Sequence, residues 1–433
     1  MELVALALGL FIVAMLVLQV PVMVYTTLQR SRAMQAQRRL EYKEWQLRLR
    51  AAETQLDRAE SNTLSWSGWR KFEVRKKVVE NKSGDICSFY FYPHDRRKLP
   101  SFEPGQFLMF RLDIPDPDDP GETIEETRCY SLSDSPNPRY YRISVRKVPS
   151  PPKQPDLPPG LVSGFLHEHI NEGDLIDVQA PSGEFFLDPD QESPVALLAG
   201  GVGVTPILSM CNTLIDRKSS REVWIFFGVR HADDLVMLPN FEFAAGHLQN
   251  AHVYICFSGD MPKGIEDGTV ADSGIIYKKG RVDSAMLKAT MPGNNYGYYI
   301  CGPEMMMKTL DKDLQAWGVP KARINWEAFG ESAAPAPAAL PAGQALTITY
   351  GASGGKSISW QGEKSIRAAA KANKFREKKI KYACGQGKCG CCHTALKSGE
   401  VAYNDVQPAF ADLQDGYCLP CIATPKTSIE LDA

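Results

Sequence analysis

The residues most suited to chemistry in this 433-residue chain are its cysteines. Six of the eleven lie between Cys384 and Cys421, and the other five are scattered singly. Cysteines crowded into one short segment are typical of a metal site, whereas the cysteines of a secreted disulfide framework are spread along the chain. The segment "YACGQGKCGCCHTA" therefore predicts a metal centre in a reducing compartment.

The spacing of these cysteines narrows the kind of centre. Cys384, Cys389 and Cys392 follow the C-x4-C-x2-C pattern of plant-type [2Fe–2S] domains, and Cys421 completes four thiolates. The interleaved glycines let such a loop wrap tightly and point backbone N–H groups at the sulfides, which stabilises the reduced cluster. Cys391 and Cys418 then lie outside the ligand set.

Zinc is the alternative. Cys389-x2-Cys392 and Cys418-x2-Cys421 form two C-x2-C pairs, a spacing that suits a structural zinc ion. Zinc would leave Cys384 and the glycines unexplained, yet spacing alone leaves both metals open.

A glycine-rich stretch, "LLAGGVGVTPILSM", joins an apolar run to a helical pattern. Gly200, Gly201 and Gly203 allow close backbone approach, and Thr205 opens a helix whose N-terminus favours anions. The stretch matches neither the G-x-G-x-x-G fingerprint nor a P-loop. It predicts a nucleotide pyrophosphate site, with a tight strand–helix turn as the alternative.

A third group is "RCYSLSDSP". Arg128 is suited to a fork on phosphate, Tyr130 offers a flat face, and Ser131 offers a hydroxyl for a heterocycle nitrogen. Taken alone, these residues are equally compatible with an ordinary edge strand.

The pattern of the whole chain predicts a multidomain fold. Alternating apolar runs over 66–190 predict an antiparallel β-barrel or sandwich. Apolar strands that alternate with helical patterns over 191–330 predict a doubly wound α/β domain with a parallel sheet. Residues 331–344 are an Ala/Pro linker, and 345–433 carry the cysteines.

The N-terminal segment is apolar. No charged residue occurs from Leu3 to Gln29, and about 20 such residues span a bilayer as a helix. We therefore expect a transmembrane anchor over 1–29, and the Arg and Lys residues that follow predict cytoplasmic catalytic domains. Residues 30–65 predict a helix, either a stalk or a solvated helix packed against the head. The net charge of −2 gives no footprint for nucleic acid.

Five motifs in this order, "RCYS", "PGLVS", "GGVGVTP", "CGPEMMM" and "WEAF", resemble the ferredoxin–NADP reductase superfamily over residues 66–433. With the cysteines at the C-terminus, the order is similar to oxygenase reductase components of the phthalate dioxygenase reductase type. The resemblance implies a flavin β-barrel, an α/β NAD(P)H domain and a β-grasp ferredoxin domain.

The resemblance also implies residue roles. Arg128 would bind flavin phosphates, Tyr130 would stack on the isoalloxazine ring, and Ser131 would lie near N5. The "PGLVS" residues Gly160, Leu161, Val162 and Ser163 would hold the pyrophosphate. The nicotinamide nucleotide would bind at Gly200, Gly201, Gly203 and Thr205, with Cys301 approaching its ring. Glu327 and Phe329 would lie by the flavin face, and Cys384, Cys389, Cys392 and Cys421 would ligate the cluster.

The implied activity is electron transfer from NAD(P)H through FAD and a [2Fe–2S] cluster to a membrane-associated oxygenase, hydroxylase or desaturase. Asp260 follows an apolar strand where it would accept a ribose hydroxyl and repel a 2′-phosphate, which favours NADH over NADPH. The alternatives are an NADH:quinone reductase or respiratory-type subunit, and a structural protein with a zinc-ribbon tail.

Overall fold

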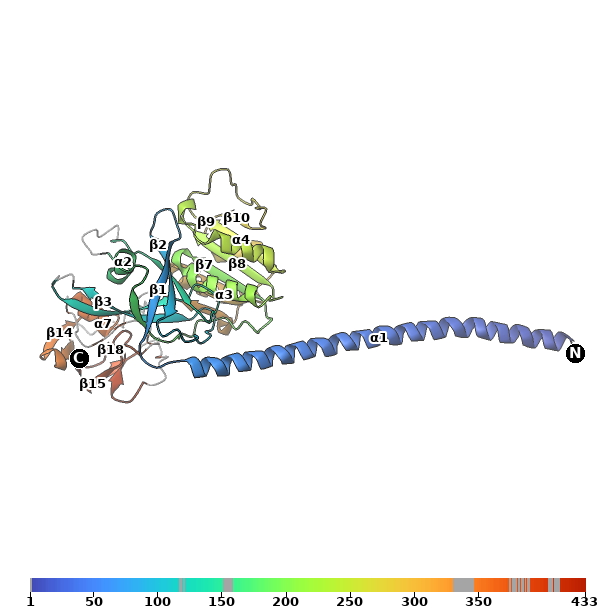
Figure 1. Ribbon diagram of the computed structural model, residues 1–433, viewed down its shortest axis with the longest axis horizontal. Helices are drawn as coiled ribbons and strands as arrows, with labels where there is room; N and C mark the ends of the chain where they lie inside the picture. Colours follow the sequence, from blue (N-terminus) through green and yellow to red (C-terminus); the bar gives the residue numbers. More distant parts are fainter. Residues whose placement is uncertain are drawn as a thin grey trace. The chain divides into compact units, whose positions relative to one another are not determined.

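The computed structural model (Figure 1) describes residues 2–433 apart from 117, 118, 120, 151–158, 330–345, 374, 376–379, 381, 383, 384, 386, 388, 389, 404–407 and 409–412. The chain forms two compact units, Met1–Asn62 and Thr63–Ala433. The predicted linker at 331–344 lies outside the described residues.

The N-terminal segment is one helix, α1 (Glu2–Leu64), with Pro21 inside it. From Glu2 onward, the helix covers the residues predicted as an anchor and almost all of those predicted as a stalk. Within the part of the chain that the structure describes, no helix combines the length and sustained apolar character needed to cross a membrane. The predicted transmembrane anchor at 1–29 is therefore not supported.

The first domain of the second unit is an antiparallel sheet with the strand order β4-β3-β6-β1-β2-β5. Its apolar side chains, among them Phe72, Phe89 and Phe110, are fully buried in one cluster. A bridge from Leu132 to Ile143 brings the two sheet edges together. The elements are β1 (Arg70–Val79), β2 (Ile86–Pro93), β3 (Phe107–Pro115), β4 (Thr123–Ser131), β5 (Tyr141–Arg146), α2 (Leu161–Glu168) and β6 (Leu175–Val178).

The second domain is a parallel sheet with the order β10-β9-β8-β7-β11-β12. Successive residues of β7 face opposite sides: Leu197 packs in one buried cluster and Leu198 in another. A sheet buried on both faces is the predicted doubly wound arrangement. The strands are β7 (Val195–Gly200), β8 (Val223–Val229), β9 (Ala251–Phe257), β10 (Ile276–Lys279), β11 (Gly297–Cys301) and β12 (Ile324–Glu327). The helices are α3 (Val204–Asp216), α4 (Leu238–His247), α5 (Ser284–Thr290) and α6 (Glu304–Ala316).

The C-terminal domain has a mixed sheet in the order β14-β13-β19-β15-β17, in which β13 and β19 are parallel. One helix, α7, packs beside it in a shared core. This α+β arrangement agrees with the predicted ferredoxin domain. The elements are β13 (Leu346–Tyr350), β14 (Lys356–Trp360), α7 (Ile366–Ala372), β15 (Thr394–Ser398), β16 (Val401–Ala402), β17 (Tyr417–Cys418), β18 (Thr424–Pro425) and β19 (Ile429–Leu431).

Candidate functional site

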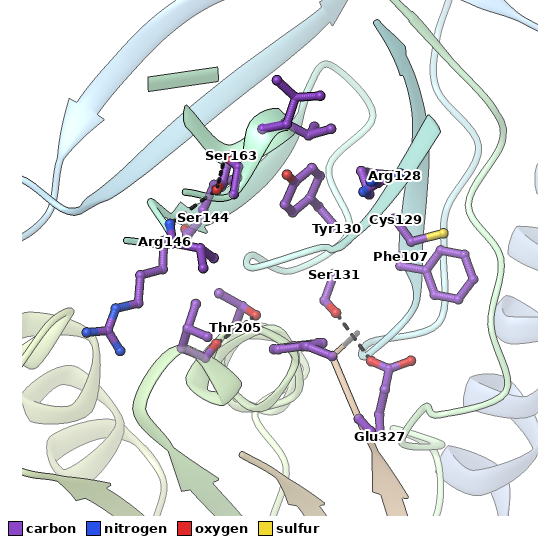
Figure 2. A pocket seen from close by; sticks show the side chains of 18 residues that line it. Phe107, Arg128, Cys129, Tyr130, Ser131, Ser144, Arg146, Ser163, Thr205 and Glu327 are labelled. Atoms are coloured by element: carbon purple, nitrogen blue, oxygen red, sulfur yellow. Dashed lines mark hydrogen bonds between the residues drawn. The ribbon is translucent and has the colours of Figure 1, made fainter. Parts of the chain in front are cut away.

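A cavity of about 380 Å³ lies where the antiparallel domain meets the α/β domain. Figure 2 shows its walls, which come from β4, β5, the N-terminus of α2, the turn before α3 and the end of β12. Its lining includes the predicted residues Arg128, Tyr130, Ser131, Gly160, Leu161, Val162, Ser163, Thr205, Glu327 and Phe329. Residues of four separate sequence motifs therefore converge on one space.

Ser131 and Glu327 connect the two domains inside this cavity. The Ser131 hydroxyl donates a hydrogen bond to Glu327 Oε2 at 3.2 Å, drawn as a dashed line in Figure 2. Each residue is only 6% exposed. A buried carboxylate and a hydroxyl at the cavity wall can hold or pass a proton near a bound ring.

Arg128 lies at the edge strand β4 with its guanidinium half-buried. Its Nη1 atom donates to Glu126 at 2.8 Å and to the carbonyl oxygen of Thr127 at 2.7 Å. Because the guanidinium carries five donors, it can also hold a phosphate. Beside it, burial raises the pKa of the Tyr130 hydroxyl well above its ordinary value, so the ring stays neutral.

The start of α2 gives the cavity a set of backbone donors. Gly160 is the N-cap, and it makes no side-chain capping bond. Ser163 Oγ donates to the Gly160 carbonyl at 3.1 Å and accepts from Val148 N at 3.1 Å. A Cβ at Gly160 would meet that hydroxyl at 2.7 Å, so glycine is needed for the tight turn. This arrangement fits a pyrophosphate held by the first N–H groups of the helix.

A second cavity of about 260 Å³ adjoins the first and shares Arg146, Val202, Ala328 and Phe329 with it. It contains the predicted residues Gly200, Gly201 and Gly203. A Cβ at Gly203 would lie 2.2 Å from the Cys301 carbonyl oxygen, so the β7–α3 turn can pack on β11 only through glycine. The cavity opens at the carboxyl ends of parallel strands, where nucleotides bind in doubly wound domains.

Two predicted residues lie outside the walls of both cavities. Cys301 is fully buried, and burial together with the charge of Glu327 raises the pKa of its thiol. Its neighbour Gly302, rather than Cys301, lines the second cavity. Asp260 is highly exposed after β9, where its Oδ2 lies 3.3 Å from His231 Nδ1.

The cysteine segment is only partly described, because Cys384 and Cys389 lie outside the described residues. Cys392 and Cys421 are buried with their sulfur atoms 3.2 Å apart. Gly385, Gly387 and Gly390 all have positive φ, which explains why glycine recurs in the loop. A Cβ at Gly387 would lie 2.2 Å from Ile422 Cδ1. The described residues of the cysteine loop therefore fit a loop that wraps closely around a metal cluster.

The sequence reasoning missed several cavity residues. Phe107 and the β5 residues Ser144 and Arg146 line the first cavity, and Arg146 lines both. Arg146 Nε also donates to Asp85 at 3.0 Å. The alternation in "YYRISVRKV" places Ser144 and Arg146 on one face of the strand. This pattern could have indicated that both residues line the cavity.

Two family models match the chain. Residues 197–312 match the oxidoreductase NAD-binding domain, and 354–426 match the 2Fe-2S iron-sulfur cluster binding domain. The second match favours the predicted [2Fe–2S] cluster over the zinc alternative.

Related proteins cover only part of this arrangement. The flavohemoprotein of Bacillus cereus is 38% identical over 268 residues, which is 62% of this chain and 62% of that protein. The chain thus spans less than two thirds of the length of this relative. The flavohem-like FAD/NAD-binding domain of nitric oxide dioxygenase from Vibrio cholerae is 31% identical, with a TM-score of 0.51 over 60% of this chain and 98% of that one.

Phthalate dioxygenase reductase shares the fold over a longer stretch, 84% of this chain and 98% of that one, at 22% identity and a TM-score of 0.50. Together, the comparisons confirm the predicted oxidoreductase class and the multidomain architecture. The chain therefore carries an oxidoreductase NAD-binding domain followed by a 2Fe–2S cluster-binding domain.

Proposed function

We propose that this protein is an NADH-dependent reductase that passes electrons through FAD and a [2Fe–2S] cluster to an oxygenase-type protein. The observation that carries the proposal is the convergence of Arg128, Tyr130, Ser131, the "PGLVS" turn and Glu327 on one cavity beside the glycine-lined cavity. In this proposal, residues 66–190 form the flavin domain, 191–330 the NADH domain and 345–433 the ferredoxin domain.

The residues present fit a flavin dinucleotide. Arg128 and the first N–H groups of α2 would hold its phosphates, and Tyr130 would pack against its ring. When bound, FAD accepts a hydride and releases electrons singly, chemistry that the protein itself cannot supply. Ser131 and Glu327 would orient the reacting edge, and the buried wall would keep water away.

FAD is supported by the 31% identity to the flavohem-like FAD/NAD-binding domain from Vibrio cholerae. NADH over NADPH rests on the acidic Asp260 at the end of β9, where a 2′-phosphate would be repelled. A kcat/KM substantially higher with NADPH than with NADH would contradict this assignment. The assignment of FAD rather than FMN is tested by extracting the bound flavin and comparing it with standards of both.

We also propose that the protein that accepts the electrons is an oxygenase-type partner. The fold shared with phthalate dioxygenase reductase supports an oxygenase-type partner at the level of architecture. Fast direct reduction of a quinone analogue would instead favour the quinone-reductase alternative.

A location at a membrane, with cytoplasmic catalytic domains, also remains a proposal. It rests on the uncharged sequence from Leu3 to Gln29 and on exposed apolar side chains along α1, such as Leu10, Phe11 and Ile12. Water-exposed apolar residues in such a row are costly unless something covers them. Membrane fractionation of the full chain, compared with a chain lacking residues 1–62, tests it: equal release of both into the soluble fraction would contradict it.

The function itself is tested by the visible spectrum before and after anaerobic NADH. Overlapping flavin and iron–sulfur bands that bleach on NADH are expected. Flavin bands alone would contradict the cluster, and the absence of both bands, in protein produced with adequate iron and flavin, would overturn the proposal.

A further inference from the structure

The pairing of β3 with β4 places four side chains on one face of the sheet. Phe107 pairs with Ser131, and Met109 pairs with Cys129. Directly paired residues of an antiparallel ladder share a face, and so do residues two apart. Phe107, Cys129 and Ser131 line the flavin cavity, where Figure 2 labels them. Met109 is therefore the neighbour of the cavity wall along this face.

Met109 contacts the C-terminal domain. Its Sδ atom lies 2.9 Å from Cys391 Sγ, although the two residues are 282 positions apart. Met109 is only 2% exposed. Cys391 directly precedes Cys392, whose sulfur faces Cys421 at 3.2 Å. Met109 thus lies beside the wall of the first cavity and contacts the residue that precedes Cys392.

Arg128, on β4, makes a second contact with the C-terminal domain. Arg128 Nη1 donates to the carbonyl oxygen of Tyr382 at 3.3 Å. The Arg367 guanidinium lies over the Tyr382 ring, 4.3 Å from its centre. The β3–β4 pair therefore contacts the C-terminal domain at two described residues, Tyr382 and Cys391.

We propose that Met109 is a positioning residue that, with Arg128, docks Tyr382 and Cys391 on β3–β4 and so sets the distance between the flavin and iron–sulfur sites. The inference rests on the proposed function. A thioether is suited to this contact because it is polarizable and adapts to its partner. Cys391 Sγ donates a hydrogen bond to Met109 Sδ, and neither residue forms a covalent bond or changes its oxidation state. Each NADH would give up two electrons and leave NAD⁺ and a proton; a bound flavin would supply the chemistry that takes up both electrons and releases them singly.

A cross-linking experiment tests the contact itself. The full chain carrying M109C, loaded with cofactors, is treated with oxidised glutathione and mapped by mass spectrometry without reduction. We expect a disulfide between position 109 and Cys391 in most molecules. The matched control is L175C, an exposed position on β6 of the same domain, which should give no linkage to Cys391. Linkage in M109C no greater than in L175C would overturn the docking.

A kinetic experiment tests the consequence. In M109E, a buried carboxylate is expected to push Cys391 away, because an unpaired charge is costly in an apolar contact. After mixing with NADH, the cluster signal in freeze-quenched paramagnetic resonance should form severalfold more slowly, because electron transfer slows as the distance between two redox centres grows. Bleaching of the flavin band should stay unchanged, and M109L should resemble the native chain.

The outcomes are distinguishable from a failure of the proposed function. A native chain whose flavin does not bleach with NADH would refute that function. A native chain that bleaches, together with an M109E cluster signal as fast as the native one, would refute only the role of Met109.

Discussion

At the scale of single residues, three C-terminal cysteines share one apolar core. Cys392, Cys418 and Cys421 are all buried there, and the sulfur atoms of Cys392 and Cys421 lie 3.2 Å apart. Burial, with a contribution from the charge of Cys421, raises the pKa of the Cys418 thiol to about 12. The C-x4-C-x2-C spacing places Cys418 outside the proposed ligand set, so we expect it to act as a core residue.

We expect C418A to keep its iron and its visible spectrum, with a loss of stability of about 1 kcal/mol from the small cavity. C421S should lose the cluster, because it removes a proposed ligand. Iron and sulfide analysis of both purified variants checks this. Loss of metal in C418A as complete as in C421S would instead indicate the paired C-x2-C set of a zinc site.

The bond between Ser131 and Glu327 gives a second prediction at this scale. S131A removes the donor and leaves a buried carboxylate without this partner, an effect of about 1.5 kcal/mol or more for a charged acceptor. If the pair orients the reacting edge of the flavin, stopped-flow bleaching of the flavin by NADH should slow about tenfold. S357A, on β14 in the C-terminal domain, should leave the rate at the native value. An unchanged rate in S131A would show that the bond is structural only.

At the scale of elements, the glycine turn between β7 and α3 positions the second cavity. Gly203 touches the backbone of β11, and the space for a Cβ is occupied by the Cys301 carbonyl. Backbone atoms cannot rotate aside as a side chain can. The packing of this turn on β11 therefore requires glycine at position 203.

G203A is expected to destabilise the α/β domain by about 1–3 kcal/mol and to weaken NADH binding, because the turn must move away from β11. G246A, in α4 of the same domain, meets nothing within 4 Å and should be neutral or slightly stabilising. Thermal unfolding and NADH titration of both variants check the pair. Equal behaviour of the two would exclude a steric role for Gly203.

At the scale of the whole molecule, the limit between the two units lies at Asn62 and Thr63. Trp66, just beyond it, belongs to the second unit: its Nε1 atom donates to Val178 O at 3.3 Å and its ring lies 5.7 Å from that of Phe72. The Arg70 guanidinium lies over the Trp66 ring, 4.9 Å from its centre.

Removal of residues 1–62 should therefore leave the spectrum and the temperature of flavin release unchanged. Removal of residues 1–69 also deletes Trp66, and the flavin should leave at a temperature lower by about 2–4 °C for each kcal/mol lost. Flavin fluorescence during heating measures this. A large shift in the shorter deletion would place the unit limit elsewhere.

The sequence by itself determined the local chemistry. Strand alternation, the buried runs of a parallel sheet and the glycine-spaced cysteines depend on neighbours a few positions apart, and such periodicities are legible in one dimension. For this reason the strand domains, the glycine turn and the cysteine loop were predicted from their motifs. The transmembrane anchor, predicted from apolar composition, was the element that the structure did not support.

Only the tertiary structure decided which distant groups meet. Ser131 reaches Glu327 across 196 positions, and Met109 reaches Cys391 across 282. Cys301, expected at the nicotinamide ring, is buried behind Gly203, and Arg146, which no motif singled out, lines both cavities. These pairings follow from how whole domains pack and which strand edges adjoin. Local patterns carry no record of that packing.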